Sequence, residues 1–164
     1  MEEVIRYFTA EKTESIGFMG AGLLALSLSI FFIFRVKLPF YNGLSYALIA
    51  IALIQIVVGA SIYFRSPKDI KRVNTIIKTD KSRLMTEEIP RMDTVLKAFK
   101  LYKWIEISLI VLGILLFIFC SRLSLWAGFG LGLSLQAGIM LILDLLAEKR
   151  GQVYLEFIQG LWIK

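Results

Sequence analysis

The chain has 164 residues, of which 57% are hydrophobic and 20% charged, with a formal net charge of +6 and no histidine. A soluble domain of this length has about 45–50% apolar residues with its charges spread out, whereas here the charges are clumped between long apolar blocks. This pattern excludes an ordinary soluble domain, a disordered chain and a nucleic-acid-binding domain. The absence of histidine removes the commonest acid–base group at neutral pH. The single cysteine, Cys120, excludes an intrachain disulfide and a cysteine-based zinc site.

Four apolar segments are long enough to cross a bilayer, which takes about 20 residues. They cover about 15–34, 44–64, 104–120 and 124–146. The outer connections are short, with Pro39 and Asn42-Gly43 as turn signals in the first of them. Short connections make neighbouring helices antiparallel. We therefore expect an all-α polytopic membrane protein, with residues 1–164 forming a single membrane domain: a four-transmembrane-helix up-down bundle with helical cytoplasmic extensions.

Lysine and arginine are distributed unevenly around these segments. Sixteen of the nineteen basic residues lie in the N-terminal segment, the central segment 65–103 and the C-terminal segment, against three in the outer connections. Cytoplasmic flanks of membrane helices are enriched in Lys and Arg. We therefore expect a multi-pass protein of the inner (plasma) membrane with cytoplasmic N- and C-termini, a cytoplasmic loop 65–103, and Cys120 at the outer face.

The expected cytoplasmic segments contain amphipathic patterns. Residues 91–103 carry apolar side chains at helical spacing, and a C-terminal helix is expected over 147–163. Pro67 and Pro90 are expected to lie in the loop. The simplest arrangement continues the membrane helices into a packed cytoplasmic stub. The alternative is that these amphipathic pieces lie flat on anionic lipid.

The loop also carries a basic cluster, made up of Lys68, Lys71, Arg72, Lys78, Lys81 and Arg83. Membrane topology alone accounts for positive charge in a cytoplasmic loop. The alternative function is a binding site for anionic lipid or an acidic partner at this basic loop.

Three polar side chains lie at similar depths within the apolar segments. At about 1.5 Å per helical residue, Gln55, Gln136 and Glu106 lie roughly 20, 21 and 24 Å from the outer turns. Because the hydrocarbon slab is about 30 Å thick, we expect an intramembrane polar layer that faces the bundle interior. The first apolar segment offers only glycines at this depth: Gly17, Gly20 and Gly22.

This polar layer has a structural and a functional interpretation. For Gln55 and Gln136 we expect an interhelical hydrogen bond that fixes the register of the bundle. For Glu106 the structural alternative is an ion pair with Arg65 or Lys103 near the membrane boundary. The functional alternative is a carboxylate that binds a proton, a cation or a substrate.

A second group of charged residues lies near the expected cytoplasmic boundary, namely Glu11, Glu14, Arg65, Asp144 and Glu148. The acidic residues are spaced three or four apart in two pairs, so each pair shares a helix face. We expect salt bridges that clamp the helix ends. An all-oxygen Mg²⁺ or Ca²⁺ site is the alternative, although we expect no bound metal or cofactor.

Small residues form a ridge along the fourth apolar segment. The ridge consists of Gly128, Gly130 and Gly132 followed by Ser134 and Gly138, and Gly128 and Gly132 match the spacing of a close-packing motif. This ridge packs against another helix of the same chain or forms the seam of a homo-oligomer or of a complex with another membrane protein. The sequence does not favour either arrangement.

We identify no catalytic constellation in the chain, and we expect a non-catalytic membrane protein that binds a partner as an assembly or protective subunit. The first alternative is an oligomeric channel or transporter that uses the layer around Glu106. The second is a membrane-embedded enzyme that acts on a lipid with the carboxylates near the cytoplasmic boundary.

Overall fold

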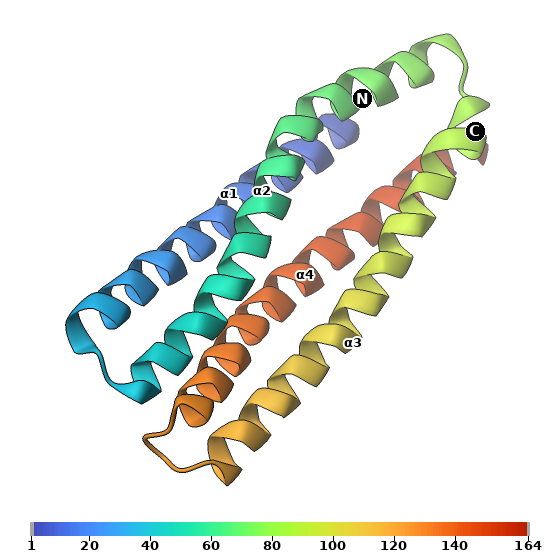
Figure 1. Ribbon diagram of the computed structural model, residues 1–164. Coiled ribbons are helices and arrows are strands. Elements are labelled where there is room, and N and C mark those ends of the chain that lie inside the picture. The colour runs from blue at the N-terminus through green and yellow to red at the C-terminus, as the bar shows by residue number, and fades with distance from the viewer. Residues whose placement is uncertain (1, 164) are drawn as a thin grey trace.

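The computed structural model describes the backbone of residues 2–163 and the side chains of residues 2–161, and throughout this range the regular structure is helical (Figure 1). The elements are α1 (Glu2–Phe31), η1 (Phe32–Val36), α2 (Pro39–Thr79), η2 (Leu84–Glu88), α3 (Ile89–Phe119) and α4 (Leu125–Ile163), where η1 and η2 are single π-helical turns. Four helices are long and apolar enough to span a membrane. The all-helical part of the sequence prediction is confirmed.

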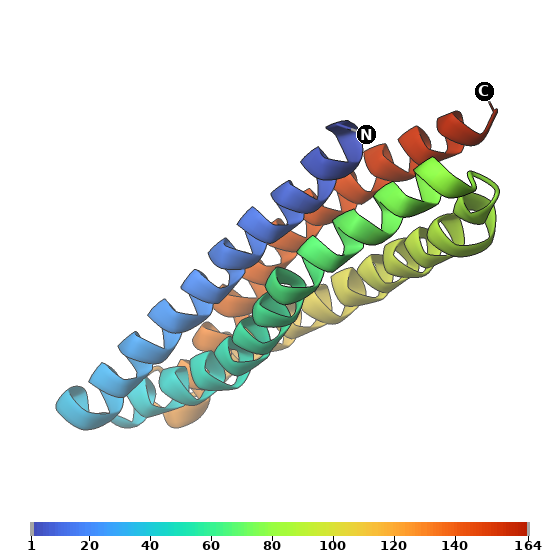
Figure 2. The same ribbon diagram turned by 90° about the horizontal axis from the view of Figure 1, so that it is seen from above.

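The four long helices pack with α2 and α4 at the centre of the bundle. Helix α1 lies along α2, α3 lies along α4, and α2 and α4 lie against each other, while α1 touches α4 over a short length (Figures 1 and 2). Within residues 2–163, α2 and α3 make no close backbone contact, although they follow each other in the chain. Both chain ends lie at the same end of the bundle (Figure 1). We call this end, formed by residues 2–14, 65–103 and 147–161, the polar end.

The connection between α1 and α2 is shorter than the sequence predicts. Only two residues separate η1 from α2, and Lys37 adopts a left-handed conformation with φ of 54° while its N–H donates to the carbonyl of Phe32 at 3.1 Å. Pro39 lies in the first turn of α2, where its fixed φ favours helix and its missing N–H costs little.

The assignment of Asn42-Gly43 as a turn was wrong, because both residues lie inside α2. A side chain added at Gly43 would collide with the carbonyl of Leu125 at the start of α4. The close approach of the two helix backbones therefore requires glycine at position 43, and no turn is needed to explain it.

Most of the expected loop 65–103 is helical. Helix α2 continues to Thr79 and includes Pro67, so the placement of this proline in a loop was wrong. An interior proline costs about 3 kcal/mol, and the turns that follow it offset this cost by burying Val73 and Ile76. Pro90, also expected in the loop, lies in the first turn of α3, where proline is tolerated.

The polar end contains its own apolar core, to which all four long helices contribute. The buried residues of this core are Val4, Tyr7, Phe8, Val73, Met92, Tyr154 and Ile158. Two further clusters lie toward the opposite end, one around Ala25 and Leu48 and one around Ile51 and Leu133. Helix α4 continues unbroken from the apolar segment into the polar end. The bundle is therefore packed at both ends.

Candidate functional site

The amides of Gln55 in α2 and Gln136 in α4 are joined by a hydrogen bond. The Nε2 of Gln136 donates to the Oε1 of Gln55 at 2.5 Å, and both side chains are buried. Gly22 of α1 packs beside this pair, because a side chain there would lie 3.3 Å from the Cβ of Gln55. The structure thus brings together two of the three predicted polar-layer residues and one of the predicted glycines.

Glu106 of α3 does not join the hydrogen bond between Gln55 and Gln136. Its side chain is buried, with 2% of the residue exposed, and neither carboxylate oxygen has a hydrogen-bond partner within the described part of the chain. Arg65 pairs with Glu11 and Lys103 pairs with Glu148. The ion pair considered for Glu106 is therefore made with neither cation.

The neighbour of Glu106 is a second acid, Asp144 of α4, whose carboxyl group lies beside it. While both groups are ionised, neither has a proton to donate, so no hydrogen bond joins them. A single shared proton, or one bound cation, would satisfy both carboxyl groups at once. The sequence groups Asp144 with the charged residues near the expected cytoplasmic boundary, whereas the fold places it beside Glu106.

Both acids line a partly open cavity of about 680 Å³ to which all four long helices contribute. Its wall is mainly apolar and includes aromatic side chains from α1 and α3, among them Phe18, Phe99 and Tyr102. It lies where α2 and α3 make no close backbone contact over the described residues. The two glutamines are outside this lining. The predicted layer is therefore divided into a closed amide pair and an acidic cavity.

Most of the charged residues predicted near the cytoplasmic boundary form ion pairs between helices. Arg65 Nη2 lies 3.0 Å from Glu11 Oε1, Arg150 pairs with Glu14, and Lys103 Nζ lies 2.7 Å from Glu148 Oε2. These contacts join α1 to α2, α1 to α4 and α3 to α4. Burial raises the pKa of Glu11, and the charge of Arg65 opposes this shift. No three metal-ligating side chains gather in the described range.

The polar end contains a charged centre that sequence reasoning missed. Glu88 of η2 is completely buried, and its carboxylate accepts hydrogen bonds from Arg72 at 2.6 Å, from Arg91 at 2.6 Å and from the hydroxyl of Tyr154 at 3.1 Å. Burial acts to raise the pKa of Glu88, but the hydrogen bonds and charges of Arg91 and Arg72 outweigh it and hold this pKa below the ordinary range. One carboxylate thus holds α2, α3 and α4 together.

One sequence signal could have revealed this centre. Residues 69, 72, 73 and 76 are spaced as one face of a helix. This spacing indicates that α2 continues past Pro67 and turns Arg72 inward, away from the exposed basic cluster. Nothing in the sequence marks Glu88 as the partner, because residues 84–88 are expected to be loop.

Gly128 and Gly132 of the α4 glycine ridge are packed within the chain. Side chains added at Gly128 and Gly132 would meet the carbonyls of Phe40 and Leu44 in α2. By contrast, a side chain at Gly138 would meet no described atom within 4 Å, and the same holds for Gly17 and Gly20. The close contact between α2 and α4 therefore accounts for Gly128 and Gly132.

No protein-family model matches the chain, and no curated protein or solved structure matches it either.

Proposed function

We propose that the chain is an integral protein of the inner (plasma) membrane, with its four long helices crossing the bilayer as an up-down-up-down bundle. The length and apolar character of the helices support insertion. The excess of Lys and Arg in 65–103 and in both terminal segments supports cytoplasmic termini. In this orientation the polar end lies at and beyond the cytoplasmic boundary.

The topology is tested with the single native thiol, since Cys120 ends α3 at the end of the bundle opposite both termini. A membrane-impermeant maleimide applied to intact cells should label it, and a Cys120→Ser variant is the labelling control. A reporter fused at the C-terminus should be active only in the cytoplasm. A C-terminal reporter active outside the cell would overturn the topology.

We further propose that the cavity around Glu106 binds a hydrophobic organic cation and that the protein belongs to the transport class. The observation that carries this proposal is that Glu106 is buried on the cavity with both oxygens unpartnered in the described chain. An ionisable group inside a membrane segment is costly unless something pairs with it. With Asp144 beside it, a bound cation would satisfy both acids without a shared proton.

The wall of the cavity favours an organic cation over a metal ion. A volume of about 680 Å³ falls in the range of pockets that hold drug-sized molecules. Aromatic faces such as those of Phe18 and Phe99 attract organic cations. A small divalent ion instead needs a tight shell of about six oxygen ligands, which a wide apolar space does not supply.

The two other functions lose the features that favoured them. Of the glycine ridge, which suggested a partner seam, Gly128 and Gly132 are used in packing α4 on α2. The boundary carboxylates, which suggested catalysis on a lipid, are mostly held by Arg65, Lys103 and Arg150. Partner binding and catalysis therefore lack a specific structural observation, whereas cation binding has one.

The test measures binding of tetraphenylphosphonium to the detergent-purified full chain by isothermal titration calorimetry. Glu106→Gln keeps the shape of the side chain and removes its charge, so binding should weaken at least tenfold. Glu156→Gln, on an exposed face of α4, should leave affinity unchanged. A neutral tetraphenyl analogue should not bind. Equal binding by wild type and Glu106→Gln, with both folded, would refute the proposal.

A further inference from the structure

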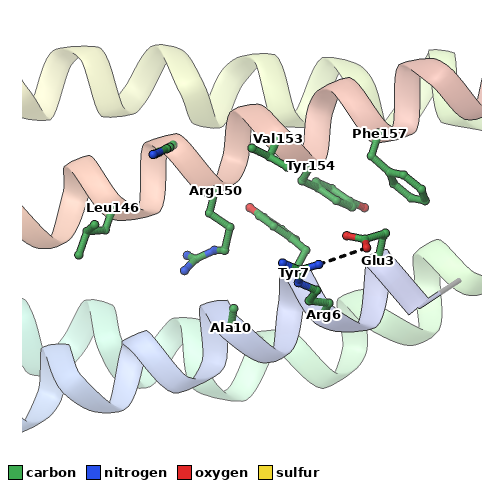
Figure 3. A pocket seen from close by; sticks show the side chains of 10 residues that line it. Glu3, Arg6, Tyr7, Ala10, Leu146, Arg150, Val153, Tyr154 and Phe157 are labelled. Carbon is green, nitrogen blue, oxygen red and sulfur yellow. Dashed lines mark hydrogen bonds and ion pairs between the residues drawn. The ribbon is translucent and has the colours of Figure 1, made fainter.

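A groove runs between α1 and α4 at the polar end, and it adjoins the Glu106 cavity at Tyr7 and Arg150. It encloses about 370 Å³ (Figure 3). Helix α1 contributes Glu3, Arg6, Tyr7 and Ala10, which share one face of the helix, and α4 contributes residues from Leu146 to Phe157. Tyr7 and Tyr154 lie side by side in the groove, with their rings stacked (Figure 3).

The groove carries an excess of positive charge. Arg6, Lys149 and Arg150 line it together with a single acid, Glu3. The contact of Glu3 with Arg6 is a long one of 3.4 Å between exposed side chains, and exposed pairs of this kind contribute little. The groove therefore attracts an anion.

Arg150 offers a donor at the base of the groove. Its side chain reaches from α4 toward Tyr7 and Ala10 of α1 (Figure 3), and its guanidinium lies 5.7 Å from the centre of the Tyr7 ring. One side of the guanidinium pairs with Glu14. The Nε group is buried and has no hydrogen-bond partner among the residues described. A buried guanidinium donor without an acceptor is costly, and an oxyanion in the groove would supply the acceptor.

The tyrosine hydroxyl groups do not compete for such a ligand. The hydroxyl of Tyr7 is directed to the sulfur of Met92 at 3.9 Å, and that of Tyr154 donates to Glu88 at 3.1 Å. Both contacts are inside the polar end. The groove therefore presents ring faces and basic groups, which suits a phosphate held by charge.

An exposed apolar row leads from the apolar part of α4 into the groove. It consists of Leu135, Ile139, Ile142 and Leu146, spaced three or four residues apart. In the proposed orientation this row faces the acyl chains of the cytoplasmic leaflet. Lys149 and Arg150 lie three and four residues after Leu146, about one helical turn further on, at the depth where lipid phosphates lie in this orientation.

We propose that this groove binds the phosphate of an anionic phospholipid from the cytoplasmic leaflet, through Arg6, Lys149 and Arg150, with an acyl chain along the apolar row. The inference rests on the proposed membrane insertion. Arg150 and Tyr7 also line the Glu106 cavity, so the two sites share these residues, whereas Arg6 and Lys149 line the groove alone. It places the lipid site on α1 and α4, whereas the sequence suggested the basic cluster of 68–83. In that cluster Arg72 and Arg83 are paired with Glu88 and Glu87.

The experiment uses the full chain purified in mild detergent and measures its affinity for short-chain phosphatidylglycerol by thermal shift and native mass spectrometry. Arg6→Gln with Lys149→Gln removes two groove charges and spares the Arg150–Glu14 pair. Each basic residue near an anionic surface contributes about fivefold in affinity, so the double variant should bind roughly 25-fold more weakly. Lys68→Gln with Lys71→Gln removes the same charge from an exposed face of α2 and should bind as the wild type does.

Phosphatidylcholine and inorganic phosphate distinguish the sources of the anion. Neither should stabilise the wild type at the concentration at which phosphatidylglycerol does. Equal binding of the two phospholipids, an equal effect of phosphate alone, or an equal loss in both double variants would overturn the proposal. Insertion is tested separately by carbonate extraction of membranes, so that a failure of the membrane proposal is distinguished from a failure of this one.

Discussion

The ring of Tyr7 in α1 stacks on the ring of Tyr154 in α4, with centroids 4.0 Å apart and ring planes within 8° of parallel. The hydroxyl of Tyr154 donates a hydrogen bond to Glu88. Burial raises the pKa of Tyr154 above its ordinary value, so this hydroxyl stays protonated at neutral pH and keeps its role as donor. Tyr154 therefore joins α1 to the charged centre that holds α2 and α3.

Two substitutions at Tyr154 separate these contributions. Tyr154→Phe keeps the stack and loses one hydrogen bond, which should lower the free energy of unfolding by about 1–2 kcal/mol. Tyr154→Ala removes a buried aromatic side chain and should cost about 3–5 kcal/mol. Denaturant unfolding in micelles measures both, with Tyr46→Phe on the exposed surface of α2 as the control. Equal losses for the Phe and Ala variants would show that the stack contributes nothing.

The charged centre makes stability depend on pH. The pKa of Glu88 is held below its ordinary value of 4.5. A carboxyl group whose pKa is lowered by folding contributes stability above its unfolded pKa and loses it as the pH falls through the folded pKa. We therefore expect the polar end to be destabilised progressively below about pH 4.5.

Glu88→Gln tests the origin of this dependence. The variant leaves Arg72 and Arg91 without their buried acceptor, so at neutral pH it should be less stable by about 2–4 kcal/mol. Protonated Glu88 resembles glutamine, so the gap from wild type should narrow as the pH is lowered toward 3. Unfolding midpoints measured from pH 3 to pH 8 check this, with Glu87→Gln on the exposed pair with Arg83 as the matched control. A gap that stays constant with pH would rule out the proposed role of the Glu88 charge.

The length of the apolar segments was enough to predict the four helices, because each segment alone determines whether it can span a bilayer. The ends of α2 were not predictable in the same way. Pro39, Asn42-Gly43 and Pro67 are local signals of a chain reversal, and at the last two tertiary packing overrides the local preference. The backbone contact of Gly43 with Leu125 depends on where two helices cross, which a single segment does not encode.

The sequence predicts how far along each helix the polar side chains lie, but it does not predict in which direction around the helix they point. Equal distance from short outer connections brings Gln55 and Gln136 together across the bundle, as their hydrogen bond shows. For Glu106, one residue along a helix changes the direction of a side chain by about 100°. Its neighbour is therefore set by the rotation and tilt of α3 against α4. Asp144 at its side could not be inferred from depth.

The glutamine pair should contribute a small, measurable coupling energy. Hydrogen bonds between membrane helices average about 0.6 kcal/mol, with a maximum near 1.7. Gln55→Leu or Gln136→Leu alone leaves a buried amide without its partner. The double variant should therefore be more stable than the sum of the two single effects predicts. A double-mutant cycle on unfolding in micelles gives the coupling, and strict additivity would show that the bond contributes nothing to stability.

Two glycines of the α4 ridge should respond in opposite directions to the same substitution. At Gly128 an added methyl group meets the carbonyl of Phe40, so α2 and α4 must move apart, and such overpacking costs about 1–3 kcal/mol. At Gly138 the same group meets no described atom within 4 Å. Gly138→Ala should therefore stabilise the folded chain by about 0.5–1 kcal/mol, since alanine is the better helix former.

Unfolding of Gly128→Ala and Gly138→Ala in micelles measures this difference, and size-exclusion chromatography with light scattering reports the oligomeric state. The ridge packs within one chain if Gly128→Ala is destabilised at every protein concentration while Gly138→Ala keeps the wild-type mass. A destabilised Gly138→Ala that also loses mass would instead place an intermolecular seam at Gly138. A tolerated Gly128→Ala would contradict the close contact of Gly128 in α4 with the backbone of Phe40 in α2.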